Sequence, residues 1–102
     1  MNYSSQVVSV RKTAIFRDWI ASLRDPRATA RIAVRIDRLS LGNPGDVRPV
    51  GDGVSEMRID YGPGYRVYFV RRGAEIVVLL CGGDKSSQSA DIAHAQRLAQ
   101  EV

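Results

Sequence analysis

The chain has 102 residues, 44% of them hydrophobic and 25% charged, so we expect residues 1–102 to form one folded domain around a single core. No apolar stretch reaches the roughly twenty residues of a membrane helix, and the first residues lack the pattern of a signal peptide, which predicts a cytoplasmic protein without membrane partners. The net charge is +4, and 13 of the 15 basic residues are arginines; arginine suits phosphate, but this composition does not by itself require a nucleic-acid ligand.

The first half of the chain predicts one strand and two helices. Residues 6–11 alternate loosely between apolar and polar and are expected to form a strand. Thr13 is a suitable N-cap for a helix over residues 14–24, in which apolar residues recur with helical spacing. Asp25 and the proline after it end that helix and begin another over residues 26–41, because aspartate caps free amides and proline fits the first helical turn.

The second half predicts an antiparallel meander and a short helix. Glycine-rich turns separate four segments, and the last of these lacks alternation, which is typical of a central strand covered on both faces. A serine at 86 or 87 can cap a final helix with a weak apolar stripe. The predicted strands cover residues 47–50, 54–61, 65–71 and 75–81. The order is therefore β-α-α-β-β-β-β-α, an α+β fold whose mostly antiparallel sheet is packed by an N-terminal helical hairpin and a short C-terminal helix.

Three polar side chains, those of Arg58, Arg66 and Tyr68, are predicted to share one face of two adjacent strands. Successive side chains of a strand point to opposite faces, so these three lie opposite their apolar neighbours. If the apolar residues face the helices, the polar ones line an open, shallow groove. Lys85 follows a Gly-Gly turn at the end of the last strand and can reach the rim of this groove. Guanidinium binds phosphate and a phenol can stack on a base, so the groove suits RNA.

A band of arginines follows the second helix opposite its apolar face. It is either a solvated face with nearby aspartates or a docking strip for structural RNA or an acidic partner. The four arginines of the band are Arg27, Arg31, Arg35 and Arg38.

The groove predicted on the sheet has a second interpretation as well, namely a solvated sheet face in which Glu56 or Asp60 pairs with an arginine.

Several standard sites are excluded by composition and spacing. One histidine and one cysteine cannot supply a zinc site, and no run of carboxylates resembles a calcium loop, so neither a metal nor a cofactor is implied. The glycines do not have the spacing of a nucleotide-binding loop. Cys81 ends an apolar run and is interpreted as core filler. His94 lies midway along the final helix, where it either faces solvent or acts as a general base.

Two segments of the second half carry a resemblance to a known family. Residues 61–69 read Tyr-Gly-Pro-Gly-Tyr-Arg-Val-Tyr-Phe, and residues 79–88 read Leu-Leu-Cys-Gly-Gly-Asp-Lys-Ser-Ser-Gln, followed by Asp91, Ile92 and Ala95. With the element order, these segments resemble the addiction-module killer proteins of the RelE/ParE toxin superfamily, in its HigB-like, phage Gp49-like branch. The resemblance covers nearly the whole chain. It implies a single RelE-like domain that is the toxin of a type II toxin-antitoxin module and cuts messenger RNA on the ribosome without a metal.

The resemblance also implies roles for individual residues. Metal-free cleavage needs a site that aligns the 2′-hydroxyl with its own phosphate and stabilises the added negative charge. By position, Arg66, Arg58 and Lys85 match the cations that bind the scissile phosphate, and Tyr68 would orient the ribose or base. The family's C-terminal tyrosine has no counterpart here, and Asp91 falls near its place as a candidate general base. Candidates for the proton acceptor and donor are Tyr68, Tyr61, Asp91 and Lys85. The implied catalytic set is Arg66, Lys85, Arg58 and Tyr68, and the implied RNA-binding set is Arg58, Arg66, Tyr61 and Gln88.

The implied partners are a cognate helix-turn-helix antitoxin, the ribosome and messenger RNA, with operator DNA contacted only through the antitoxin. Two alternatives stay open. The superfamily also contains ParE-like inhibitors of DNA gyrase that act by binding, and a toxin-fold protein without activity could serve as an antitoxin-binding co-repressor.

Overall fold

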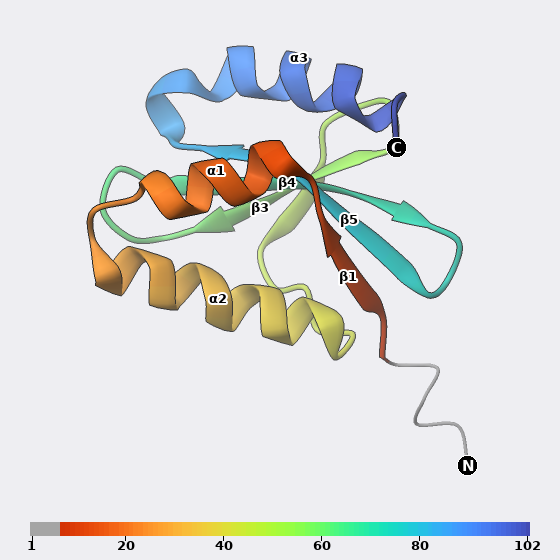
Figure 1. Ribbon diagram of the computed structural model, residues 1–102, viewed down its shortest axis with the longest axis horizontal. Helices are drawn as coiled ribbons and strands as arrows, with labels where there is room; N and C mark the ends of the chain where they lie inside the picture. Colours follow the sequence, from red (N-terminus) through yellow and green to blue (C-terminus); the bar gives the residue numbers. More distant parts are fainter. Residues whose placement is uncertain (1–6) are drawn as a thin grey trace.

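The computed structural model describes residues 7–102, which form three helices and a five-stranded sheet (Figure 1). The order of elements confirms the predicted α+β fold, and the arrangement is compatible with a RelE-like architecture. Boundaries differ from the predicted ones by a few residues, and position 6 of the predicted first strand lies outside the described residues. Within 7–102, no helix is both long and apolar enough to cross a membrane. The elements are β1 (Ser9–Lys12), α1 (Ala14–Ser22), α2 (Pro26–Ser40), β2 (Val47–Pro49), β3 (Val54–Ile59), β4 (Tyr65–Arg72), β5 (Ile76–Gly83), the short turn η2 (Lys85–Ser87) and α3 (Gln88–Ala99).

The sheet is mostly antiparallel, with one parallel edge. Its strand order is β1-β5-β4-β3-β2, in which only β1 runs parallel to its neighbour β5. Strand β5 lies inside the sheet and has buried residues on both faces, as its unbroken apolar run predicts. Strand β5 lies between β1 and β4, and β4 occupies the middle of the order.

Side-chain caps begin both N-terminal helices, as predicted. The hydroxyl oxygen of Thr13 accepts from the N–H of Phe16 (3.0 Å) and donates to the carbonyl of Leu80 (2.6 Å), which ties the start of α1 to β5. A carboxylate oxygen of Asp25 accepts from the N–H of Arg27 (2.9 Å) at the start of α2. These bonds satisfy amides that a helix leaves free at its first turn.

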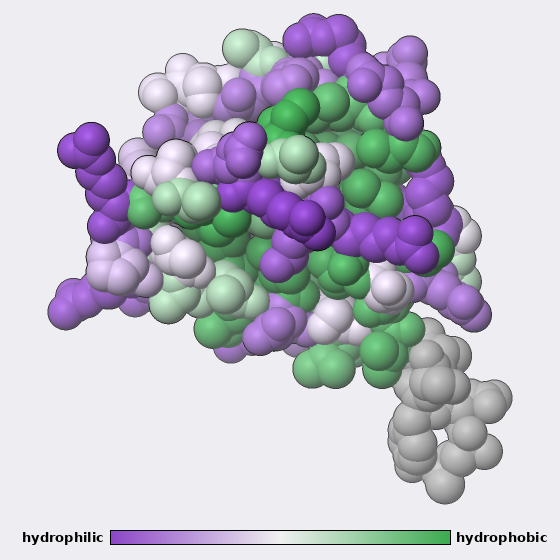
Figure 2. Space-filling model, in the orientation of Figure 1, coloured by the Kyte–Doolittle hydropathy of each residue, from purple (hydrophilic) through white to green (hydrophobic). Residues whose placement is uncertain are grey.

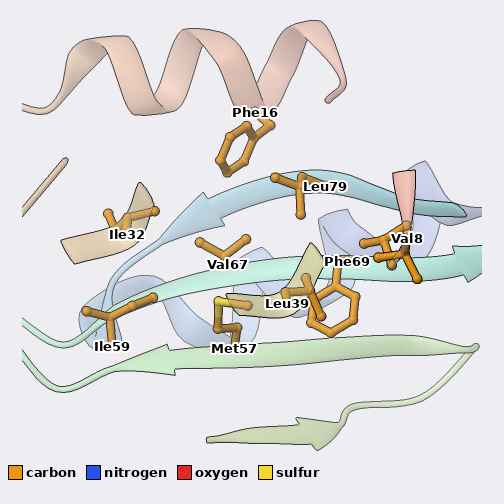
Figure 3. Close-up of a cluster of buried hydrophobic side chains, with 10 residues drawn as sticks. Val8, Phe16, Ile32, Leu39, Met57, Ile59, Val67, Phe69 and Leu79 are labelled. Atoms are coloured by element: carbon orange, nitrogen blue, oxygen red, sulfur yellow. The ribbon is translucent and has the colours of Figure 1, made fainter. Parts of the chain in front are cut away.

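The first hydrophobic core lies between the sheet and the hairpin of α1 and α2 (Figure 3). Helix α1 contributes Phe16, and α2 contributes Ile32 and Leu39; each is at most 1% exposed. Each such side chain stabilises the fold by about 1.5–3 kcal/mol through the apolar surface that it removes from water. The sheet contributes Met57, Ile59, Val67, Phe69, Val77 and Leu79.

A second core lies on the opposite face of the sheet, under α3, so the prediction of a single core is wrong, and the predicted polar face is largely covered. Leu98, Ala95 and Ala99 of α3 pack in the same buried cluster as Val54 and Val70 of the sheet. The expectation failed because alternation along a strand tells which residues share a face but not whether a helix covers that face. The other buried members are Tyr68, Leu80 and Cys81.

Glycines at the end of β5 allow both helical layers to approach the sheet. A β-carbon at Gly82 would overlap the indole of Trp19 in α1, and one at Gly83 would overlap the carboxylate of Asp91 in α3. Cys81, the residue before them, is buried as predicted, and burial raises the pKa of its thiol to about 12.

Candidate functional site

A hollow of about 450 Å³ lies where the β3–β4 turn meets the end of β5. Arg58 of β3 and Arg66 of β4 are cross-strand neighbours, so their side chains leave the sheet on the same face. Lys85 begins the turn after β5, and its N–H donates to the carbonyl of Pro63 in the β3–β4 turn (3.4 Å). Three predicted site residues therefore meet at one concave surface. The lining residues are Asp46, Arg58, Ile59, Asp60, Gly62, Pro63, Gly64, Arg66 and Lys85.

An exposed ion pair with Asp46 holds the side chain of Arg58. Its Nε and Nη2 donate to Oδ1 of Asp46 at 3.2 and 2.9 Å, and the two side chains are 43% and 53% exposed. The guanidinium holds the pKa of Asp46 below its ordinary value. Exposed pairs of this kind contribute little to stability, so a phosphate can replace the carboxylate at a small cost in free energy.

The side chain of Arg66 is more enclosed and only 12% exposed. Its Nε is buried and has no hydrogen-bond partner among residues 7–102, while Oε1 of Glu56 lies 3.9 Å away. A β-carbon built at Gly64 would lie 3.8 Å from Nη1 of Arg66. The guanidinium therefore extends from Glu56, inside the protein, to the turn that borders the hollow.

Glu56 is fully buried and organises the residues behind the hollow. Its carboxylate accepts from Arg48 Nε, the Tyr68 hydroxyl and Gln88 Nε2, each at 2.9 Å. Burial alone would raise the pKa of Glu56, but the three hydrogen bonds lower it below the ordinary value. A buried carboxylate in this setting is charged, and its charge faces the unpartnered Nε of Arg66.

Tyr68 does not line an open groove, which corrects the expectation for this residue. Its ring is fully buried in the second core, and its hydroxyl donates to Glu56. Burial raises the pKa of Tyr68, and the hydrogen bond to the Glu56 carboxylate raises it further. Tyr68 therefore reaches the hollow only through Glu56.

Two other predicted residues lie at the start of α3 and do not line the hollow. Gln88 donates to Glu56, so it belongs to the same buried cluster as Tyr68. Asp91 accepts from the hydroxyl of Ser87 (2.5 Å) and packs against the backbone of Gly83. The structure thus places Asp91 beside the end of β5, outside the lining of the hollow.

Tyr61 lies on the side of the sheet that carries α2. Its hydroxyl donates to Asp25 Oδ2 (2.7 Å), and the guanidinium of Arg31 covers its ring at 4.7 Å from the centroid. The ring also packs against the first core. Tyr61 is therefore occupied by protein groups and is not part of the lining of the hollow.

The arginines predicted as a band line one groove of about 580 Å³ along α2, but one of them is turned inward. Arg35 Nη1 donates to the carbonyl of Arg58 (2.6 Å), and its Nη2 donates to the carbonyl of Pro44 (3.1 Å). Arg35 therefore connects α2 to β3 and to the loop before β2. The exposed members of the band are Arg27, Arg31 and Arg38.

The sequence interpretation missed the part played by two carboxylates. The sequence predicts Glu56 only as a surface partner of an arginine, although its position two residues before Arg58 puts both on one face of β3. Asp46 stands in a glycine- and proline-rich turn, and no periodic pattern signals its contact with Arg58. Asp46 and Asp60 are the carboxylates that line the hollow.

The arrangement suits binding of a phosphate group. Two guanidinium groups and an ammonium group surround a concave surface, and each can donate charge-assisted hydrogen bonds to an anionic oxygen. Within residues 7–102, no three side chains of histidine, cysteine, aspartate or glutamate lie together as metal ligands would.

Comparison with known proteins gives the family. Residues 18–101 match the family model described as phage-derived protein Gp49-like (DUF891), and the chain belongs to this family. The family is associated with the toxins of toxin-antitoxin modules. The chain is also 48% identical over 95 residues to an uncharacterized protein of Haemophilus influenzae. The aligned residues cover 93% of this chain and 96% of that protein.

Proposed function

We propose that this chain is the toxin of a type II toxin-antitoxin module and that it arrests growth by cutting messenger RNA in the ribosomal A site, without a metal ion. The observation that carries this proposal is the convergence of Arg58, Arg66 and Lys85 on one hollow. Membership of a toxin-associated family supports it. The proposed partners are the ribosome with its messenger RNA, in the cytoplasm, and a helix-turn-helix antitoxin that carries the complex to operator DNA.

The proposed reaction is a transfer within the RNA strand. The ribose 2′-oxygen attacks the adjacent phosphorus, and the bond from phosphorus to the next 5′-oxygen breaks, which leaves a 2′,3′-cyclic phosphate and a 5′-hydroxyl. Arg58 and Arg66 would hold the phosphate and stabilise its added negative charge. Lys85 would stabilise the same charge or give a proton to the leaving 5′-oxygen.

The 2′-hydroxyl proton also needs an acceptor. Asp46 and Asp60 line the hollow, whereas Asp91 is hydrogen-bonded to Ser87 and does not line it, so position favours the first two over Asp91. Tyr68 and Gln88 would support the reaction indirectly, because both bind the Glu56 carboxylate that faces Arg66.

Replacement of Arg66 tests the proposal. Arg66→Ala should abolish growth arrest, and primer extension on translated messenger RNA should show no cleavage. Arg71→Ala is the matched control, because Arg71 lies on the same strand, is exposed and does not line the hollow. Thermal unfolding of both variants separates loss of the site from loss of the fold. Cleavage by the Arg66 variant at the rate of the control would contradict the proposed site.

Inhibition of DNA gyrase by binding is a second candidate, and one observation favours it. The lining of the hollow contains three cations but no histidine, and one of its two carboxylates is paired with Arg58. Such a surface can bind an anionic or acidic target without proton transfer. Loss of supercoiling activity in purified gyrase, with translated RNA left intact, would select this candidate over the nuclease.

A further inference from the structure

The groove along α2 combines a cationic rim with an apolar floor. Arg27, Arg31 and Arg38 are exposed at its rim, and Ala30, Val34 and Ile59 form the apolar part of its lining. Figure 2 shows hydrophilic side chains beside hydrophobic ones on the face that carries α1 and α2. We propose that this groove binds an acidic amphipathic helix of a partner protein, with its apolar side on the floor and its carboxylates against the rim.

The charge of the rim is available to a partner. Among residues 7–102, the ion pairs are formed by Arg48, Arg58 and Arg66, and no carboxylate lies within 4.0 Å of a charged nitrogen of the three rim arginines. Arg35, the remaining arginine of the groove, already donates to backbone carbonyls. Carboxylates of a partner would therefore meet three guanidinium groups without displacing an existing ion pair.

The floor of the groove favours a protein over RNA. Val34 is 47% exposed in the middle of α2, and a phosphodiester chain bound to the rim would leave this apolar surface without a matching partner. Recognition of single-stranded RNA commonly uses aromatic rings on which bases stack. Within residues 7–102, no aromatic ring is among the groove's lining residues, and the ring of Tyr61 is covered by Arg31 and its hydroxyl bonded to Asp25.

The spacing of the rim sets the length of the occupant. Arg27 and Arg38 are 11 residues apart on α2, a distance of roughly 16 Å at 1.5 Å per residue. About three turns of a partner helix span this distance. Its carboxylates would face the three arginines if the second and third lay one turn and three turns beyond the first. An amphipathic helix laid in a groove is an established mode of protein recognition.

The location of the groove gives the occupant a regulatory role. Ile59 and Asp60 line both the groove and the hollow that contains Arg58, Arg66 and Lys85. A helix that fills the groove therefore ends beside the hollow and limits access to it. This regulatory step rests on the proposed toxin function, with the antitoxin as occupant, whereas the docking itself does not.

A synthetic peptide tests the docking directly. The probe is a fluorescein-labelled amphipathic helix of about 14 residues with leucines on one side and glutamates at the stated spacing. Fluorescence anisotropy should detect binding to the full chain, and amide shifts in NMR spectra should fall in α2 and at residues 59–60. The variant R27E/R31E/R38E should weaken binding by about a hundredfold, and V34D by about tenfold.

Matched controls make the result decisive. The variant R17E/R71E/R97E changes the net charge equally at three exposed arginines outside the groove, and it should bind within about threefold of the unchanged chain. Equal loss in both triple variants, or full binding by V34D, would overturn the proposal. Tighter binding of a labelled RNA duplex, lost in the groove variant but kept in V34D, would overturn it in favour of RNA. Because no RNA is cleaved in this assay, its outcome is independent of the nuclease proposal.

Discussion

The Nε of Arg66 faces the carboxylate of Glu56 at 3.9 Å, which is too far for a hydrogen bond but within the distance of an ion pair. Arg48, Tyr68 and Gln88 hold that carboxylate from β2, β4 and α3. Glu56 thus connects three elements to the arginine that the proposed mechanism needs most. In the proposed mechanism Glu56 would be a positioning residue, because it does not line the hollow.

Replacing Glu56 with glutamine should reduce both stability and the proposed activity. Glu56→Gln keeps the size of the side chain but removes the charge. The NH₂ group of the new amide would also face N–H donors of Arg48 or Gln88, so at least one of these hydrogen bonds would be lost. We expect the free energy of unfolding in urea to fall by about 2–3 kcal/mol. Cleavage of translated RNA should fall, mainly through the rate of the bound complex. An unchanged rate in a variant that has lost this stability would show that Glu56 does not position Arg66.

The pKa of Glu56 predicts a dependence of stability on pH. Because its folded pKa lies below the ordinary value of 4.5, the folded state binds fewer protons than the unfolded state between the two values. The contribution of Glu56 is therefore complete above pH 4.5 and is lost as the pH falls through its folded pKa. Urea unfolding at neutral pH and below pH 4.5 measures this change. The fall in the free energy of unfolding between the two pH values should be smaller in Glu56→Gln than in the unchanged chain. An equal fall in both proteins would mean that other carboxylates cause the pH dependence.

Tyr68 should act through Glu56 and not on RNA directly. Tyr68→Phe keeps the buried ring and removes one of three hydrogen bonds to the carboxylate, so the free energy of unfolding should fall by about 1 kcal/mol. Cleavage and growth arrest should persist at a reduced level, in contrast to Arg66→Ala. Complete loss of cleavage by a stable Tyr68→Phe protein would mean that the hydroxyl reaches the substrate.

The sequence predicted that Arg58 and Arg66 share one face of adjacent strands, because two regular signals agree there. Period-two alternation assigns each residue to a face, and the Gly-Pro-Gly turn brings the two strands together. The structure adds the register, in which Arg58 stands opposite Arg66. Glycine, proline and helix caps likewise predicted the order of elements. These are local signals, and they depend on residues close together in the chain.

The burial of Tyr68 and the inward turn of Arg35 could not be predicted in this way. The face that carries Tyr68 is covered by α3, in which two of the three buried residues are alanines, so the helix gives only a weak apolar stripe. Helical spacing places Arg35 with the other arginines of α2, but its guanidinium binds carbonyls at positions 44 and 58. Both outcomes depend on contacts between segments far apart in the sequence, which no periodic pattern records.

Arg35 should stabilise the fold, whereas Arg38 on the same helix should not. Arg35→Ala leaves the carbonyls of Pro44 and Arg58 without its guanidinium donors, and we expect the free energy of unfolding to fall by about 1–3 kcal/mol. Arg38→Ala is the matched control, because Arg38 is exposed and forms no ion pair within residues 7–102; its change should stay within about 0.5 kcal/mol. Hydrogen exchange gives a local measure, since the Arg58 N–H donates to the carbonyl of Asp46 (3.0 Å). This amide should exchange faster in Arg35→Ala only, and equal exchange in both variants would show that Arg35 does not hold the loop before β2 against β3.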